Sequence, residues 1–212
     1  MSEPGLFEII FSTRAMRRLK PDPVPDELIR KILEAGQSAP NGSNAQAWGF
    51  LVVKDPQVKK AVQVYYQRAY DTLSGKHYAA ELAALPPGEA RDKLERQVSA
   101  VAYLTEHFHE APVWIVACQQ TGPQGANVGS AASIYPAVQN MLLAARALGL
   151  GSTLTARHMA YGKEVDALFG LPEGVASFAI LPIGYPMGNF GPVRRGPLSE
   201  VAHLDRWGQP YV

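Results

Sequence analysis

Three short apolar runs set among longer helical patterns are the feature that most constrains the fold of this chain. The runs occupy residues 48–53, 111–118 and 178–185, and each has the composition of a buried strand. Helical patterns outnumber these runs and do not alternate with them as regular crossovers. The sequence therefore predicts an α+β fold with three or four strands rather than a doubly wound parallel sheet.

Five helices are expected around these strands, and one of them carries the clearest apolar stripe. That helix covers residues 131–148, with Pro136 in its first or second turn, where a missing N–H donor costs least. Gly149 is expected to end this helix, and Gly36 to end an earlier one. The other helices are expected at residues 6–11, 26–36, 57–73 and 163–169.

Two segments depart from this pattern of helices and strands. Residues 65–105 contain a Pro-Pro-Gly break between helical stretches, and their length suits a lid or excursion over a site. Residues 186–212 are rich in proline and glycine and are expected to form an extended C-terminal arm. Because no internal repeat is present, the chain of 212 residues is expected to fold as one domain.

Composition and charge exclude several classes of function. The chain has 20 Lys+Arg against 19 Asp+Glu, so no global field attracts nucleic acid or a membrane surface. Cys118 is the single cysteine and lies in an apolar run, so we expect a buried, inert thiol and no intrachain disulfide. The start of the sequence lacks a secretory signal, and no apolar window is long enough to span a membrane, so a cytoplasmic protein is expected.

Several well-known site motifs are missing from the sequence. Residues 149–153 (GLGST) follow a helix and lack the third glycine of a dinucleotide fingerprint, and there is no Walker loop. His107 and His109 are two residues apart with no third ligand nearby, so no metal site is expected. No serine lies in a G-x-S-x-G turn. The tyrosines at 65, 66 and 70 are expected to pack, while the role of Arg68 stays open.

Three basic or polar clusters remain, and we expect them to converge on one site. Residues 13–19 (TRAMRRL) hold three arginines, residues 39–48 (APNGSNAQAW) form a polar loop before a strand, and residues 194–195 are both arginine. Guanidinium groups and adaptable polar contacts suit a planar cofactor that carries a phosphate. Each cluster also has a plainer interpretation, since arginines stabilise the end of a helix and Asn-Gly-Ser is common in turns.

The order of these segments closely resembles the FMN-dependent nitroreductase family. The resemblance covers nearly the whole chain except about residues 65–105, and it runs through residues 13–19, 39–48, 111–113, 136–140, 148–152, 181–186 and 194–198. It implies a three-layer nitroreductase-like fold, with a small mixed or antiparallel sheet flanked by helices. It also implies a domain-swapped homodimer with two flavins at the interface.

The resemblance also implies which residues bind FMN. Arg14 would hold the phosphate and Arg17 would lie beside N1 and O2 of the flavin. Ala15 would contact FMN through its backbone. The family often has serine at this position, so a contact from a side-chain hydroxyl is lost here. Arg194 and Arg195 match the C-terminal basic pair that would close on the phosphate, and the match is better at Arg195. The full implied set is Arg14, Ala15, Arg17, Pro40, Asn41, Gly42, Asn44, Thr153, Leu154, Thr155, Arg194 and Arg195.

Two segments of this implied set have distinct positions. Residues 40–44 would reach the FMN of the partner subunit. Residues 153–155 would form the turn behind the flavin, where a backbone N–H faces N5.

The activity implied by the resemblance is that of an FMN-dependent NAD(P)H oxidoreductase with ping-pong kinetics. NADH or NADPH would deliver hydride to flavin N5 and leave, and a nitroaromatic, a quinone or a related acceptor would then take the electrons. No side chain need act as a general acid, so no catalytic residue is expected beyond electrostatic support from Arg17. The sequence does not choose between NADH and NADPH.

Four other interpretations stay open at this stage. Relatives with the same fold could cleave flavin with oxygen or remove halogen reductively, and they would differ over residues 65–105. A flavin-binding protein without turnover is a third interpretation. An oligomeric interaction module with incidental arginines is the fourth.

Overall fold

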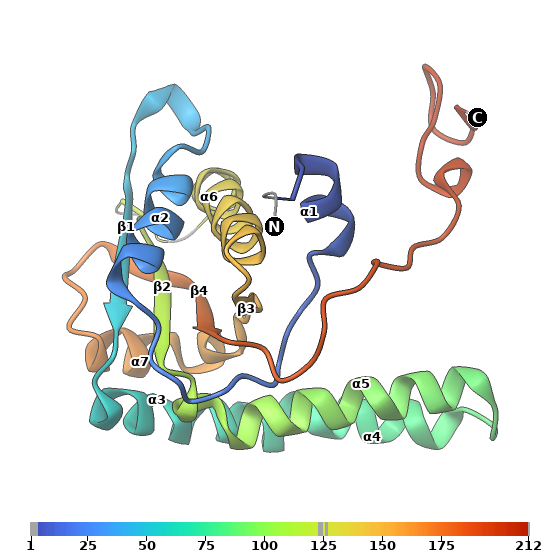
Figure 1. Ribbon diagram of the computed structural model, residues 1–212, viewed down its shortest axis with the longest axis horizontal. Helices are drawn as coiled ribbons and strands as arrows, with labels where there is room; N and C mark the ends of the chain where they lie inside the picture. Colours follow the sequence, from blue (N-terminus) through green and yellow to red (C-terminus); the bar gives the residue numbers. More distant parts are fainter. Residues whose placement is uncertain (1–3, 123–124, 126, 212) are drawn as a thin grey trace.

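A four-stranded antiparallel sheet forms the centre of the molecule (Figure 1). The computed structural model describes residues 4–122, 125 and 127–211. The expectation of no secretory signal concerns the start of the chain, whose first three residues lie outside the described residues. The strand order is β1-β2-β4-β3, which confirms the α+β prediction and makes the sheet purely antiparallel. The strands are β1 (Trp48–Val53), β2 (Val113–Gln120), β3 (Gly151–Ser152) and β4 (Val175–Gly184).

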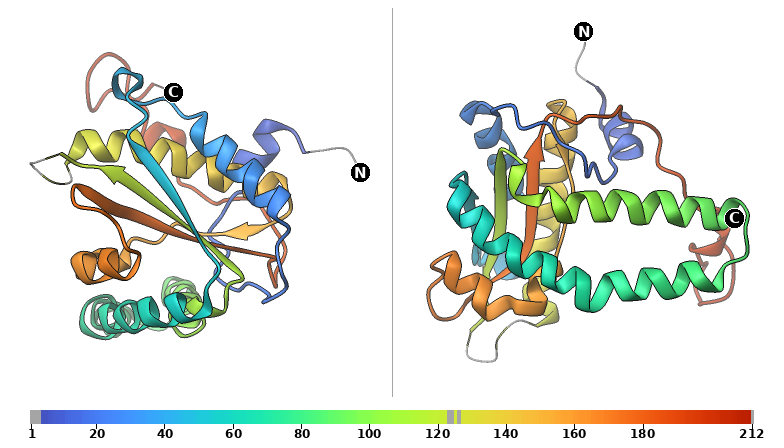
Figure 2. Two further views of the ribbon diagram at one scale, coloured as in Figure 1. Left: turned by 90° about the vertical axis from the view of Figure 1, so that its left-hand side faces the viewer. Right: turned by 90° about the horizontal axis from the view of Figure 1, so that it is seen from below.

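Helices cover both faces of the sheet, so the fold has three layers (Figure 2). One face packs against α2 and α6, and the other packs against α3, α7 and the end of α5. The helices are α1 (Leu6–Ser12), α2 (Asp26–Gln37), α3 (Pro56–Ala69), α4 (Gly75–Ala84), α5 (Glu89–Glu106), α6 (Val128–Ala147) and α7 (Gly162–Leu168).

Strand β2 is buried on both sides, because it lies between two other strands and under two helical layers. Val113 and Ile115 face α2 and α6, whereas Trp114 and Val116 face α3 and α7. This alternation is the period of two of a β-strand, and it explains why the sequence shows a continuous apolar run. The strand begins after Pro112, two residues later than predicted, since proline has no N–H to pair.

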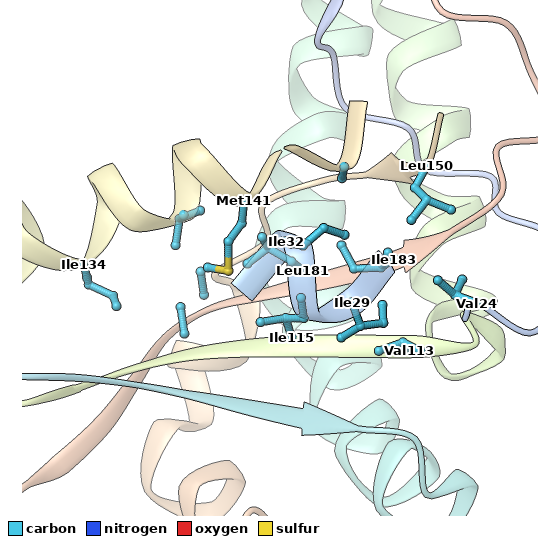
Figure 3. Close-up of a cluster of buried hydrophobic side chains, with 14 of the residues drawn as sticks. Val24, Ile29, Ile32, Val113, Ile115, Ile134, Met141, Leu150, Leu181 and Ile183 are labelled. Atoms are coloured by element: carbon cyan, nitrogen blue, oxygen red, sulfur yellow. The ribbon is translucent and has the colours of Figure 1, made fainter. Parts of the chain in front are cut away.

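The core between the sheet and helices α2 and α6 is packed tightly (Figure 3). Ile32 and Met141 are fully buried there against Leu181 of β4. Gly36 was expected to stop α2 but lies inside its last turn, which ends at Gln37. A Cβ at Gly36 would stand 2.8 Å from Cγ of Met141, so this glycine permits a close approach of two helices.

The position of Pro136 in α6 differs from the prediction. The helix begins at Val128, and the Asn127 side chain caps it by accepting a hydrogen bond from the backbone N–H of Ser130. Pro136 therefore lies in the third turn instead of the first or second. Residues 128–130 (VGS) lack an apolar stripe, so periodicity alone places the start too late.

Residues 65–105 form most of a helical hairpin that projects from the body (Figure 1, bottom). A π-helical turn, Tyr70–Ser74, carries the chain from α3 into α4, and α5 returns antiparallel to α4. The predicted Pro-Pro-Gly break separates α4 from α5. Within the described part of the chain, no helix combines the length and apolarity needed to cross a bilayer.

The C-terminal arm, residues 186–211, leaves the body as an extended segment (Figure 1, red). Its first part is tied to the N-terminal region, because Met187 N–H donates to Arg18 O and Val193 N–H donates to Phe11 O. Its last part carries apolar side chains that this chain does not cover, and Trp207 is 91% exposed. The arm has no helix or strand from residue 187 to residue 197, and it then forms a 3-10 turn at Leu198–Glu200 and a bridge between His203 and Pro210.

A buried polar network links α7 to β4. His158 is fully buried, its Nε2 lies 3.0 Å from Oγ of Ser177, and Ser177 in turn donates to the carboxylate of Asp166. Because the serine proton goes to the carboxylate, the Nε2–H of His158 donates to the serine oxygen. Burial lowers the pKa of His158 to about 4 and raises the pKa of Asp166.

We expect this histidine to make folding stability depend on pH. The unfolded chain takes up a proton on His158 near pH 6.5, whereas the folded chain takes it up only near pH 4. Stability is therefore lost as the pH falls through this window, by about 2 kcal/mol between pH 7 and pH 5. Urea unfolding should show that His158→Asn loses about 2 kcal/mol less folding stability than the parent protein over the same pH range. The exposed His77→Asn serves as the control, and an identical pH dependence in both variants would contradict the assignment.

Candidate functional site

The arginine-rich segment, residues 13–19, is fixed along the edge of the sheet. Met16 N–H donates to Ser152 O of β3 at 2.9 Å, and Lys20 N–H donates to Tyr185 O at 2.8 Å. Gly151 makes this approach possible, because a Cβ there would stand 2.8 Å from Leu19 Cδ2. The buried Met16 anchors the segment between its arginines.

Arginines from opposite ends of the chain line one cavity of about 340 Å³, which we call the inner cavity. Arg14, Arg17 and Arg195 all border it, together with Thr153 and Leu154 from the turn after β3. The remaining walls come from α1, α6 and the start of the arm. This volume is that of a small-molecule site, and the predicted convergence of the two arginine clusters is confirmed.

A second hollow of about 810 Å³, the outer cavity, shares several of these residues. Arg14, Arg17 and Arg195 border both cavities, while Arg18, Lys93 and Arg194 border only the outer one. Across the described residues, neither cavity has an aspartate or glutamate in its wall. The site is therefore strongly positive although the chain is nearly neutral.

Arg17 has the least compensated charge of the inner cavity. Burial lowers the pKa of its guanidinium, and the nearby charge of Arg157 lowers it further, against the opposing influence of Tyr78 and Tyr66. Within the described part of the chain no hydrogen bond or ion pair engages this guanidinium. Arg14, in contrast, donates to the backbone oxygen of Asn189 at 2.8 Å. The donors of Arg17 are thus available to a ligand.

The turn behind the cavity, residues 153–155, is held rigidly by the sheet and by α3. Thr155 exchanges two backbone hydrogen bonds with Ile180 of β4. Its Oγ1 lies 2.8 Å from the hydroxyl of Tyr66, which is stacked on Phe108. Thr153 and Leu154 border the inner cavity, whereas the side chain of Thr155 is engaged behind it.

The polar loop, residues 40–44, lies away from the cavities of its own chain. None of Pro40, Asn41, Gly42 and Asn44 lines them, and Gly42 N–H instead donates to Ser133 Oγ on α6. Non-glycine residues at positions 43, 44 and 46 have φ of +53°, +52° and +49°. This left-handed backbone is costly, and such strain concentrates at functional sites. A contact of this loop with a partner subunit's ligand stays a prediction.

Helix α5 supplies site residues that the sequence reasoning missed. Lys93, Gln97 and Ala100 lie at helical spacing and line the outer cavity. The helical spacing of these three residues can be seen in the sequence, but the sequence does not show that this face of the helix points toward the site. Tyr66 packs as expected, and Arg68 lies over the ring of Tyr161, with no part in either cavity.

The residues set aside by the sequence reasoning have structural roles. Cys118 is buried in β2, as expected, and burial raises the pKa of its thiol to about 12. His107 stacks on Tyr103 and lies 3.0 Å from a carboxylate oxygen of Glu110. In the part of the chain that the structure describes, no cluster of three or more metal-ligating side chains occurs.

The three-layer fold thus places a basic cavity at the edge of the sheet. Residues 10–185 match the model of the Nitroreductase family, which is most of the chain. The chain therefore belongs to the nitroreductase family.

Similar proteins include NADH dehydrogenases or nitroreductases and iodotyrosine deiodinases. The chain is 31% identical over 199 residues to an NADH dehydrogenase of Thermus thermophilus, which covers 89% of this chain and 90% of that one. It is 26% identical over 196 residues to Iodotyrosine deiodinase 1 of Rattus norvegicus, covering 88% of this chain but only 64% of the deiodinase. Among solved structures, oxidized iodotyrosine deiodinase bound to FMN and 3-iodo-L-tyrosine has a TM-score of 0.72 at 26% identity, covering 95% of this chain and 99% of that one.

We expect the hydroxyl of Tyr66 to stabilise the turn behind the cavity. Tyr66→Phe removes the partner of Thr155 Oγ1 and should lower the free energy of unfolding by about 1 kcal/mol. Urea unfolding at neutral pH measures this loss. Tyr65→Phe is the matched control, since no described residue bonds to its hydroxyl, and equal losses in the two variants would contradict the role of this hydrogen bond.

Proposed function

We propose that the protein is an FMN-dependent NAD(P)H oxidoreductase that reduces nitroaromatics, quinones or related acceptors. The observation that carries the proposal is the meeting of Arg14, Arg17 and Arg195 around one cavity. Membership of the nitroreductase family and the FMN held by a relative of the same fold support it.

The residues of the inner cavity fit FMN by charge and by shape. Arg14 and Arg195 offer planar guanidinium groups, which make strong, often bidentate hydrogen bonds to a phosphate dianion. Residues 153–154 offer a fixed wall against which a flat ring system can lie. Ala15 has no hydroxyl to offer, so its contact with the cofactor would be through the backbone.

Arg17 has a different role from the other two arginines. Its guanidinium is partly desolvated and has no acceptor among the described residues, so it would favour negative charge on the ring portion of a bound flavin. FMN, when bound, supplies the redox chemistry by accepting hydride from a nicotinamide donor and passing electrons to an acceptor. The chain's own task is to bind, orient and polarise, which requires no acid–base pair.

We further propose that the working form is a homodimer. Exposed apolar side chains lie on α1 and on the arm, two elements that also contribute residues to the inner cavity; they include Phe7, Phe11, Leu198, Val201 and Trp207. A second copy of the chain would cover these groups, and its loop at residues 40–44 would then reach this cavity. The strained backbone of that loop supports such a role.

Reductive dehalogenation is the competing activity, because the deiodinase relatives are comparably similar. The substrate held by the deiodinase structure, 3-iodo-L-tyrosine, carries an ammonium group as well as a carboxylate. A buried ammonium group is stabilised by a carboxylate or by several other oxygen acceptors, and across the described residues neither cavity has a carboxylate in its wall. This chemistry favours acceptors that are neutral or anionic over a zwitterionic amino acid.

A purified preparation tests the proposed function. The protein should be yellow, or become so with added FMN, and should oxidise NADH or NADPH steadily when a quinone is present. Iodide release from 3-iodo-L-tyrosine should be much slower than quinone reduction, and the flavin should survive turnover in air. A colourless protein that does not bind FMN would end the proposal, and loss of the flavin in air would replace it with flavin cleavage.

We expect Arg195→Ala to weaken FMN binding. One charge-assisted contact to phosphate is worth about 1.5–3 kcal/mol, so the FMN dissociation constant should rise about 10- to 100-fold. Fluorescence titration of the apoprotein with FMN measures it. Arg96→Ala, an exposed arginine of α5 that lines neither cavity, should leave the constant unchanged. An unaltered constant in Arg195→Ala would speak against the phosphate assignment.

We expect Arg17→Ala to slow reduction of the bound flavin more than it affects stability. The loss of a partly buried cation near the ring should slow reduction by at least about tenfold, while unfolding changes by less than about 0.5 kcal/mol. Stopped-flow absorbance under anaerobic conditions gives the rate. Arg17→Lys keeps the positive charge and should recover part of the reduction rate. Equal rates in Arg17→Ala and the parent protein would refute the electrostatic role.

A further inference from the structure

The positive charge around the two cavities exceeds what a single FMN requires. The phosphate of FMN carries about two negative charges, and the inner cavity already supplies Arg14 and Arg195 for it and Arg17 for the ring portion of the flavin. The outer cavity adds three further cations, Arg18, Lys93 and Arg194. Within the described chain none of these three forms an ion pair, although the molecule pairs other arginines, such as Arg91 with Glu95.

Arg18 is held in place by two elements that flank the outer cavity, helix α5 and the arm. The guanidinium of Arg18 lies 4.3 Å from the ring centre of Tyr103 on α5, and the Tyr103 hydroxyl contacts Sδ of Met187 at the root of the arm. Lys93 lies on the same helix, where Gln97 and Ala100 continue the cavity wall. Mutual repulsion between these cations lowers the stability of the folded protein, and a bound polyanionic ligand would offset that repulsion.

Size and connection indicate what kind of polyanion fits. The outer cavity measures about 810 Å³ and shares Arg14, Arg17 and Arg195 with the inner one, so a ligand in it can extend to the flavin position. It offers guanidinium and ammonium groups, a side-chain amide from Gln97 and a small residue at Ala100. Those features suit the phosphates and the sugar of a nucleotide.

We propose that the outer cavity binds the phosphorylated adenosine half of the nicotinamide donor, and that Arg18, Lys93 and Arg194 make the enzyme prefer NADPH to NADH. This inference rests on the proposed function. The two donors share a pyrophosphate, and they differ by one phosphate dianion on the adenosine ribose. Arg18 and Lys93 are not among the residues that the family resemblance assigns to FMN, and the donor with the additional dianion best explains them.

Equilibrium binding to the FMN-loaded, oxidised protein tests the inference without turnover. Isothermal titration should show that adenosine 2′,5′-bisphosphate binds at least about tenfold more tightly than adenosine 5′-monophosphate. The double variant Arg18→Gln/Lys93→Gln should reduce this ratio to about two or less, and Arg194→Gln should lower it partly. The double variant Lys76→Gln/Arg96→Gln removes the same charge from exposed positions outside both cavities and should keep the parent ratio.

Two results would overturn the inference: equal binding of both nucleotides by the parent protein, or an unchanged ratio in Arg18→Gln/Lys93→Gln. The FMN dissociation constant of that variant should match the parent value, which separates loss of the donor site from loss of the cofactor. If NADH and NADPH reduce the flavin with equal KM, the inference fails while the proposed function stands. If neither reduces it, the proposed function fails as well.

Discussion

The attachment of residues 13–19 to the edge of the sheet is the interaction on which the rest of the site depends. Two backbone hydrogen bonds, to Ser152 and Tyr185, fix the segment, and Gly151 allows it to come close enough to form them. Side chains of three arginines are thereby held beside a rigid wall rather than on a flexible surface segment. Precise placement of charge on a fixed scaffold is what stabilises a bound anion most effectively.

The positions of the charged side chains determine the electrostatics of the site more than the net charge of the chain does. The chain has a formal net charge of +1, yet six cations border two adjoining cavities in which no acidic side chain takes part among the described residues. Acidic residues elsewhere, such as Glu8 beside Arg146, balance the total. The nearly neutral composition therefore conceals a strongly positive site.

The sequence predicted the parts of the fold that rest on long, regular patterns. The bounds of β1 and the break before α5 were read correctly, because an apolar run and a Pro-Pro-Gly stop are local signals. Strand β3 was not predicted, because a strand of two residues is too short to show the alternation of apolar and polar side chains. The convergence of Arg14 with Arg195 was expected through family resemblance, whereas Lys93 was not, because the orientation of the α4–α5 hairpin depends on long-range packing.

The π-helical turn at Tyr70–Ser74 has a consequence for how this hairpin can change. Such a turn accommodates about one residue more than an α-helical turn, and each residue rotates a helix by about 100°. Deleting one residue there would swing Tyr78 away from Arg17 while leaving the sheet and the arginine segment intact. This turn therefore sets how α4 is rotated about its axis, while the sheet and the backbone hydrogen bonds of the arginine segment do not depend on it.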